Sequence, residues 1–296
     1  MILLFVLGFL VRLYRLDGPV ADWHSFRQSD TNAVSVIFAR DGIDLLHPRY
    51  FDISNVQSGK ENPQGYRMVE FPIYNAIQAG LYGVFGILTL EQWGRLISIF
   101  STLAGGWFVY LLTKKYAGPP AGGFAAFFYL FLPFSIFYGR TILPDPSMAG
   151  SILAGTYFFD RWLSKKSIQY SVFSIQFGLA VVFTGLAFLL KPYALFFTVP
   201  MVYLVWRKFG VNVLRTWQIW LFGILCLVPL ILWRKWIGNF PEGIPASSWL
   251  FNGNGIRFRP AFFRWIVYER VTKLILGHIG ILFLAGGLWR MVKNKN

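Results

Sequence analysis

The sequence predicts an all-α membrane protein, a polytopic bundle of transmembrane helices with a long polar loop after the first helix. Of the 296 residues, 55% are hydrophobic and only 14% are charged, whereas soluble domains are nearer half apolar and a quarter charged. Several apolar runs approach the roughly 20 residues that a helix needs to cross a bilayer. The basic residues fall between these runs, as they do in membrane proteins.

Nine apolar runs follow one another along the chain, and eight of them are expected to cross the membrane. The run at 71–90 is the exception, because Asn75, Gln78 and interspersed Gly, Pro and Thr positions weaken it as a span. An interfacial helix tolerates such polar positions on its wet face. The eight spans are expected near 2–15, 96–112, 120–138, 143–159, 172–190, 192–206, 216–233 and 274–289.

The basic residues predict the topology. If 71–90 stays outside the hydrocarbon, four basic groups that follow apolar runs all fall on one side, which the positive-inside rule makes cytoplasmic. These groups are Lys114-Lys115, Arg161 with Lys165-Lys166, Arg207-Lys208 with Arg215, and Arg290 with Lys293 and Lys295. The loops at 17–95 and 234–273 then lie outside, on the same side as Arg140, Asp145 and Lys191. Arg12 and Arg15 fall at the outer end of the first span, where we expect them to snorkel to lipid headgroups.

The chain is therefore expected to be a single transmembrane domain over 1–296, with juxtamembrane helices in its first outer loop. The net charge of +15 reflects loop topology and does not indicate a nucleic-acid partner. Cys226 stands alone inside an apolar run, so neither an intramolecular disulfide nor a cysteine metal site is expected. Residues 1–16 lack the basic start of a signal peptide, and we expect them to form the first span.

The first outer loop holds most of the acidic residues. Nine of the thirteen lie between Asp17 and Glu91. The stretch Asp22-Trp23-His24-Ser25-Phe26-Arg27-Gln28-Ser29-Asp30 opens this region with two carboxylates, an imidazole, a guanidinium and an amide. Carboxylates at the edge of a membrane are placed for chemistry on a lipid-borne substrate, so the functional site is expected here.

Asp30 and Asp22 are the candidate catalytic carboxylates, with Asp30 preferred. A group transfer to a hydroxyl, such as a sugar transfer with inversion, needs one carboxylate to take the proton of the acceptor. The leaving phosphate needs only positive charge or hydrogen bonds around it. A structural alternative exists for Asp30, because it precedes Thr31 and an apolar-periodic run to Arg40, which is a good N-cap position.

His24, Arg27 and Gln28 lie between these two acids. Hydrogen bonding to a sugar or phosphate is the preferred role, and plain solvation of a loop is the alternative. Together with Asp22 and Asp30 they also form a set of possible metal ligands. Their spacing matches no specific metal signature, however, so we expect no metal cofactor, and a divalent ion remains the lesser alternative.

Four more polar residues are flanked by apolar runs. Glu70 precedes Pro72 at a helix start, and it is expected either to mark that start or to orient a substrate. Arg140 and Asp145 bracket a Pro-containing turn between two spans; ionisable groups at such places are functional candidates by default. Lys191 interrupts the apolar stretch from 172 to 206, and it is expected to bind a lipid phosphate or to snorkel at a Pro-defined turn.

Four motifs follow one another along the chain, at 39–50, 70–74, 138–145 and 190–192. Together they resemble membrane glycosyltransferases of the GT-C type, most of all the ArnT-like and protein-mannosyltransferase-like group (glycosyltransferase family 39/83). Ala39-Arg40-Asp41-Gly42 followed by His47-Pro48-Arg49-Tyr50 resembles the "ARN/ARE…PRY" segment of that group. Glu70-Phe71-Pro72-Ile73-Tyr74 is similar to its "EKPPLYY" segment. Two turns are similar to its "YSRTALPD" and "TKP/TKG" turns: Tyr138-Gly139-Arg140-Thr141-Ile142-Leu143-Pro144-Asp145 and Leu190-Lys191-Pro192.

The resemblance covers roughly residues 1–210, and two positions depart from the pattern. On a gapless register the acidic pair "DE" of the group falls at Thr31-Asn32, and Asp30 matches only with a shift of one residue. The Lys of "EKP" is Phe71 in this chain, which removes one expected contact to phosphate or acceptor. Members of the group often continue with further spans and an outer soluble domain, so the chain is also interpretable as an N-terminal piece.

The resemblance implies a transferase that moves a sugar from a polyprenyl-phosphate donor to a lipid, glycan or protein acceptor. It implies a bacterial inner (plasma) membrane location with the site on the outer face. Arg140, Lys191 and Arg67 would hold the donor phosphate, and Asp145 and Glu70 would orient the substrate. Two alternatives stay open: a transporter or flippase of lipid-linked sugar, and a catalytically degenerate assembly subunit.

Overall fold

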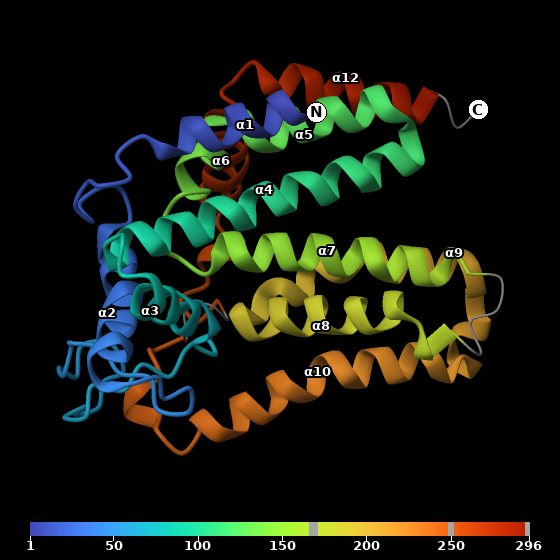
Figure 1. Cartoon of the computed structure of the whole chain (residues 1–296). Helices are drawn as coiled ribbons and strands as arrows, with labels where there is room; N and C mark the ends of the chain where they lie inside the picture. The colour runs from blue at the N-terminus through green and yellow to red at the C-terminus, as the bar shows by residue number, and fades with distance from the viewer. Residues whose placement is uncertain (166–170, 248–251, 294–296) are drawn as a thin grey trace.

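The computed structural model describes residues 1–165, 171–247 and 252–293. These segments are helices joined by turns and loops, and their only strand-like feature is an isolated bridge between Arg49 and Tyr66. The predicted all-α bundle is confirmed. Figure 1 shows its main helices running side by side: α4 (Leu90–Ala117), α5 (Pro119–Phe131), α7 (Asp145–Leu163), α8 (Ile175–Leu190) and α10 (Trp217–Ile237).

Helix α4 and its turn into α5 follow directly from local sequence. Thr89 and Gln92 form a capping box that fixes the start of α4. Gly118 ends the helix at a φ of +86°, a conformation that favours glycine, and Pro119 follows as the first residue of α5. Lys114 and Lys115 lie in the last turn of α4, where positive charge complements the helix dipole.

Glycines let α4, α7 and α8 approach closely. A Cβ added to Gly150 of α7 would lie 2.6 Å from the carbonyl oxygen of Ser101 in α4, and one added to Gly155 would collide with Thr184 of α8. Small residues at such contacts are typical of helices that associate within a bilayer. Aromatic side chains fill the adjoining core, among them Phe159 and Trp162, both buried.

Helices α2 (Ser25–Asp41) and α3 (Ile73–Phe85) lie side by side at one end of the bundle (Figure 1). The predicted 71–90 helix is α3, but the expectation for its polar face was wrong. Asn75 and Gln78 are buried and donate hydrogen bonds to α2, at 2.6 Å to the Thr31 carbonyl and at 2.7 Å to Asn32. The exposed face of α3 is instead apolar, with Ile77, Val84 and Phe85 outermost.

Arg12 was expected to reach lipid headgroups, and this was wrong. Its side chain is fully buried at the break between α5 and α6 (Pro133–Tyr138). Pro133 follows the last residues of α5 and prevents that helix from continuing. The guanidinium donates hydrogen bonds to the carbonyls of Leu130 and Ser135, at 2.7 and 3.2 Å. Arg12 therefore satisfies the Leu130 carbonyl, which the break leaves without a helical partner. The first helix, α1 (Ile2–Leu10), is thereby tied to the bundle.

By length and composition, three helical stretches of the described chain can cross a membrane: Leu90–Phe131, Pro192–Arg215, which includes α9 (Val199–Phe209), and Trp217–Ile237. A fourth qualifies only if Pro260–Ile275 and α12 (Gly280–Lys293) count as one span, and these are bent by 107°. The predicted span at 274–289 is thus interrupted at Gly277 and His278, both with positive φ. The chain is an integral membrane protein, and the count of eight spans stays a prediction.

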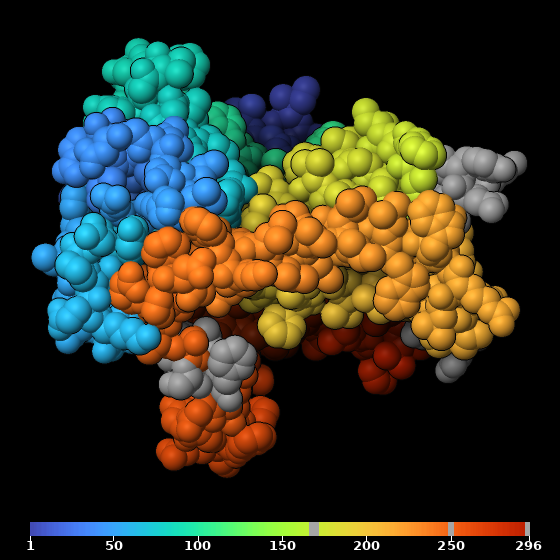
Figure 2. Space-filling view, turned by 90° about the horizontal axis from the view of Figure 1, so that it is seen from below, coloured from blue at the N-terminus to red at the C-terminus, as the bar shows by residue number. Residues whose placement is uncertain are grey.

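The placement of the basic helix ends bears on the predicted topology. The turns before α7 and after α8 lie at the end that carries α2 and α3, while the basic last turns of α4 and α9 lie at the other end (Figure 1). Figure 2 shows the first loop gathered at the former end, with α10 running away from it. The basic ends of α4 and α9 share one end of the bundle as predicted, while the basic last turn of α10, with Arg234 and Lys235, lies at the other. Lys166 and Lys295 lie outside the described residues.

Candidate functional site

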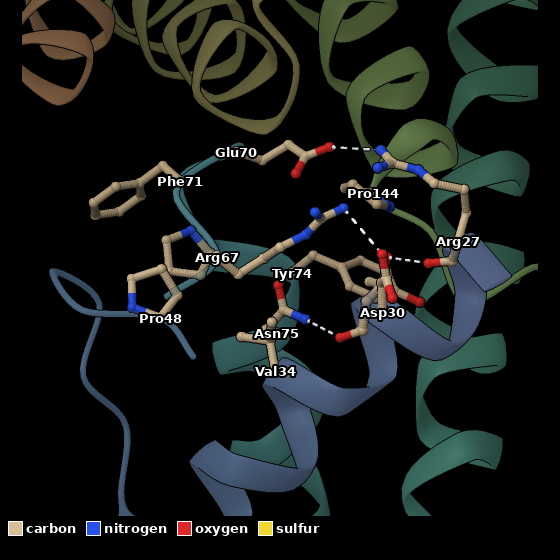
Figure 3. A pocket seen from close by; sticks show the side chains of 12 residues that line it. Arg27, Asp30, Val34, Pro48, Arg67, Glu70, Phe71, Tyr74, Asn75 and Pro144 are labelled. Carbon is tan, nitrogen blue, oxygen red and sulfur yellow. Dashed lines mark hydrogen bonds and ion pairs between the residues drawn. The ribbon is translucent and has the colours of Figure 1, made fainter. Parts of the chain in front are cut away.

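A narrow pocket opens where three segments of the chain meet. Helix α2 contributes Arg27 and Asp30, the loop before α3 contributes Arg67 and Glu70, and Pro144 comes from the turn before α7. Figure 3 shows Arg67 reaching into this space, with its guanidinium directed to Asp30 and Glu70 nearby. The cavity volume is only about 20 Å³, room for a single water. A sugar therefore needs side chains here to move apart.

A row of charged side chains, here called the charge chain, runs along the pocket from α2 to the end of α8. Arg27 lies 3.5 Å from a carboxylate oxygen of Glu70, and the same oxygen accepts a hydrogen bond from the ammonium of Lys191. Lys191 also lies 3.5 Å from Asp145, which accepts a hydrogen bond from the Tyr193 hydroxyl. Lys191 is buried, so these two carboxylates take the place of water around its ammonium group.

Electrostatics keep Glu70 ionised although it is partly buried. Burial acts to raise the pKa of the Glu70 carboxyl, but the charge and hydrogen bond of Lys191 and the charge of Arg27 outweigh it. The pKa of Glu70 is therefore held below its ordinary range. A phosphate entering the pocket must share Lys191 with Glu70 or displace it.

Asp30 faces the pocket from inside helix α2. The helix begins at Ser25, with His24 as its N-cap residue, so Asp30 is not an N-cap and the capping alternative is wrong. Its carboxylate lies 3.2 Å from a guanidinium nitrogen of Arg67 and accepts a hydrogen bond of 3.3 Å from Gln57. Arg67 is held in turn by Gln57 and by the ring of Tyr50, 5.1 Å from its guanidinium carbon.

Asp22, Gln28 and Arg140 form a separate brace behind the pocket. Gln28 is buried; it donates a hydrogen bond of 2.7 Å to Asp22 and accepts one of 3.0 Å from the backbone of Ile142. Arg140 lies 3.7 Å from Asp22 and donates to the carbonyl of Tyr14 at 2.9 Å. None of the three lines the pocket. The brace instead fixes α2 against the turn before α7.

His24 is placed apart from the carboxylates. Its backbone has a φ of +60°, and its ring stacks on Trp23 at 5.4 Å and lies 5.9 Å from the ring of Tyr138. Within residues 1–165, 171–247 and 252–293, no group of three His, Cys, Asp or Glu side chains could hold a metal ion. The expectation of no metal cofactor stays a prediction.

The predicted residues thus divide into two sets. The pocket and its charge chain contain Asp30, Arg27, Arg67, Glu70, Asp145 and Lys191. The brace contains Asp22, Gln28 and Arg140, and His24 lies apart, stacked on Trp23. Sequence reasoning missed Gln57, which no motif marks, and Tyr193, whose position next to Pro192 in the Lys191 turn was a usable signal.

The chain matches one known protein family in sequence. The sequence model of the family described as "Dolichyl-phosphate-mannose-protein mannosyltransferase" matches residues 70–236, more than half of the chain. No curated protein matches the chain in sequence.

Two solved structures share the fold. The crystal structure of ArnT from Cupriavidus metallidurans in the apo state has 21% identity and a TM-score of 0.57, covering 82% of this chain and 42% of ArnT. The structure of ArnT bound to undecaprenyl phosphate has 20% identity and a TM-score of 0.59, covering 85% of this chain and 43% of ArnT. The chain thus spans about two fifths of the ArnT length.

Proposed function

Because the chain belongs to the dolichyl-phosphate-mannose-protein mannosyltransferase family, we propose that it is a GT-C-type glycosyltransferase that takes a sugar from a polyprenyl-phosphate donor. The observation that carries the proposal is the pocket itself. A carboxylate, Asp30, and two buried cations, Arg67 and Lys191, line it or border it at the polar end of a membrane bundle. The fold shared with ArnT supports the same reading.

Asp30 is the proposed general base. It removes the proton of the acceptor hydroxyl while that oxygen bonds to the anomeric carbon of the sugar. The bond from the anomeric carbon to the phosphate oxygen breaks, and its electron pair leaves with polyprenyl phosphate. Attack opposite to the leaving group inverts the anomeric centre. Arg67, 3.2 Å from Asp30, keeps the carboxylate oriented before the acceptor arrives.

Lys191 and Arg67 are the proposed partners of the donor phosphate, because both charges are buried beside the pocket. Arg27 is a third cation on the lining. Glu70 and Asp145 hold Lys191 in place and orient the substrate through it. In this proposal Arg140 acts on the phosphate only indirectly, because its contacts are to Asp22 and Tyr14.

The pocket is proposed to face the outer side of a bacterial plasma membrane. It lies at the end of the bundle opposite the basic last turns of α4 and α9 (Figure 1), and basic ends stay cytoplasmic by the positive-inside rule. The acceptor is a lipid, a glycan or a protein. Its hydroxyl must reach Asp30, which is one-fifth exposed.

The degenerate-subunit alternative has one observation in its favour, because Thr31 and Asn32 replace the acidic pair of the group. Thr31 donates a hydrogen bond of 2.8 Å to the carbonyl of Arg27, and Asn32 donates one of 2.9 Å to Glu91. Both side chains therefore serve α2 and its packing. Asp30 is the pocket carboxylate adjacent to them, which supports the one-residue shift in register.

A panel of polyprenyl-phosphate sugars tests the proposed function. With purified protein in proteoliposomes and a crude membrane extract as the source of acceptor, we expect at least one donor to be consumed with release of polyprenyl phosphate. A flippase would move the intact donor across the bilayer without consuming it, and a degenerate subunit would do neither. Either of these results contradicts the transferase assignment.

A further inference from the structure

A second and much larger cavity opens on the side of the bundle, away from the polar pocket. It has a volume of about 790 Å³ and an almost wholly apolar lining, formed by α4, α5, α7 and the stretch from Phe197 to Arg207. Leu153 of α7 and Leu204 of α9 are typical of its walls. The cavity lies along segments expected to face hydrocarbon, so an apolar molecule of the membrane can reach it.

The size of this cavity limits what can fill it. Its volume falls in the range of roughly 300–1,000 Å³ that is usual for single small ligands. One flexible hydrocarbon chain therefore fits this space.

One charged residue, Arg207, lines this cavity. Arg207, in the last turn of α9, is exposed and forms no ion pair with a carboxylate of the described segments. Asp160 of α7 pairs with other groups: Lys115 and the hydroxyl of Tyr116 both donate hydrogen bonds to its carboxylate at 2.6 Å. Tyr116 and Tyr203 add hydroxyl groups to the same lining.

The arrangement at Arg207 suits a phosphate. A guanidinium binds phosphate oxygens in a two-pronged geometry, and the basic residues Lys114, Arg161 and Lys208 lie in the last turns of neighbouring helices at this end. Clusters of this kind attract anionic headgroups of the cytoplasmic leaflet. The charge and the apolar cavity together describe a molecule with one anionic head and a long hydrocarbon chain.

We propose that this cavity binds an acyl chain of an anionic membrane phospholipid, with its headgroup phosphate on Arg207. The site is distinct from the pocket of Asp30, and it does not depend on the proposed glycosyltransferase function. The bound lipid fills space between α4, α7 and α9 that protein side chains leave open.

Photo-crosslinking in nanodiscs tests the proposal. The probes are phosphatidylglycerol and phosphatidylcholine with the same diazirine-bearing acyl chain, and the adducts are mapped by mass spectrometry. We expect phosphatidylglycerol adducts on the segments that line the cavity, about fivefold more than for phosphatidylcholine. Both lipids carry the phosphate, but the choline ammonium cancels its charge, and about fivefold is the preference expected when one Arg faces a net anionic headgroup. Arg207→Gln should remove that difference.

Two matched variants keep the result interpretable. Arg215→Gln removes an exposed basic residue outside the lining and should change nothing. Leu153→Trp narrows the cavity and should lower adducts of both lipids there, with the thermal unfolding midpoint as the check on folding. Adducts spread over the outer surface of the bundle, or an unchanged preference in Arg207→Gln, would overturn the proposal. Displacement by polyprenyl phosphate at the concentration of the probe would assign the cavity to the donor instead.

Discussion

Asp30→Asn is expected to lower kcat for sugar transfer by about 10²–10⁴-fold, the usual cost of losing a general base. The proton of the acceptor is transferred in the transition state, so kcat should fall much more than KM rises. Asparagine keeps the size of the side chain and still accepts the hydrogen bond of Gln57, 3.3 Å from the carboxylate. The change therefore removes the base with little change in the shape of α2.

Two other aspartates provide matched controls. Asp52→Asn alters another carboxylate that accepts from Gln57, at 3.4 Å, but that does not line the pocket. Asp22→Asn alters the brace behind the pocket. Both should keep kcat within about tenfold of the parent protein, well short of the loss of a base. Near-normal turnover of Asp30→Asn with none in Asp22→Asn would assign the base to Asp22.

Lys191→Ala is expected to destabilise the protein by about 3–5 kcal/mol, the usual cost of removing one partner from a buried ion pair. The change leaves the half-buried Glu70 with only Arg27 nearby, at 3.5 Å. Thermal unfolding in detergent measures the effect. Lys191→Arg keeps the charge and should lose much less, and Lys191→Ala with Glu70→Gln should recover part of the loss, because it removes both partners.

The pH dependence of the same measurement should change direction. In the parent protein the pKa of Glu70 is lowered, so its contribution to stability is present above the ordinary Glu range and is lost as the pH falls through the folded value. Without Lys191, burial should raise that pKa, and protonation then favours the folded state. Lys191→Ala should gain stability from pH 7 towards pH 5, where the parent does not. Parallel profiles of the two proteins would show that Lys191 does not determine the charge of Glu70.

The same ion pair is proposed to bind donor. In the folded double variant, Lys191→Ala with Glu70→Gln, affinity for polyprenyl phosphate should fall by about 1.5–3 kcal/mol, as for a lost hydrogen bond to a charged group. Polyprenol, which lacks the phosphate, serves as the control ligand and should bind both proteins alike. An unchanged affinity for polyprenyl phosphate would return Lys191 to a structural role.

Much of this architecture was accessible from sequence, because apolar runs and basic residues report on helices and on their ends. The alternation of the basic groups predicted that Arg140, Asp145 and Lys191 would lie at the end of the first loop. The ion pairs between Lys191, Glu70 and Asp145 are the result. Pairing depends on the fold, so the sequence alone did not show which acid would meet which base.

Other features depend on packing that local sequence does not encode. The start of α2 was misplaced because its N-cap residue, His24, is in a left-handed conformation and makes no side-chain cap, so no usual start signal is present. Gln28 was expected at the substrate, but burial makes it a link between Asp22 and Ile142. Asn75 and Gln78 were expected to face water, whereas they are buried and donate hydrogen bonds to α2.

Photoaffinity labelling with a polyprenyl-phosphate sugar that carries a diazirine on the sugar tests the central claim most directly. The claim is that the donor sugar binds in the pocket between α2 and the loop before α3. Adducts should map to residues 27–34 and 67–75, which hold most of the lining, and unlabelled donor should suppress them. Adducts confined to the apolar cavity beside Arg207, or labelling that excess donor does not reduce, would contradict it.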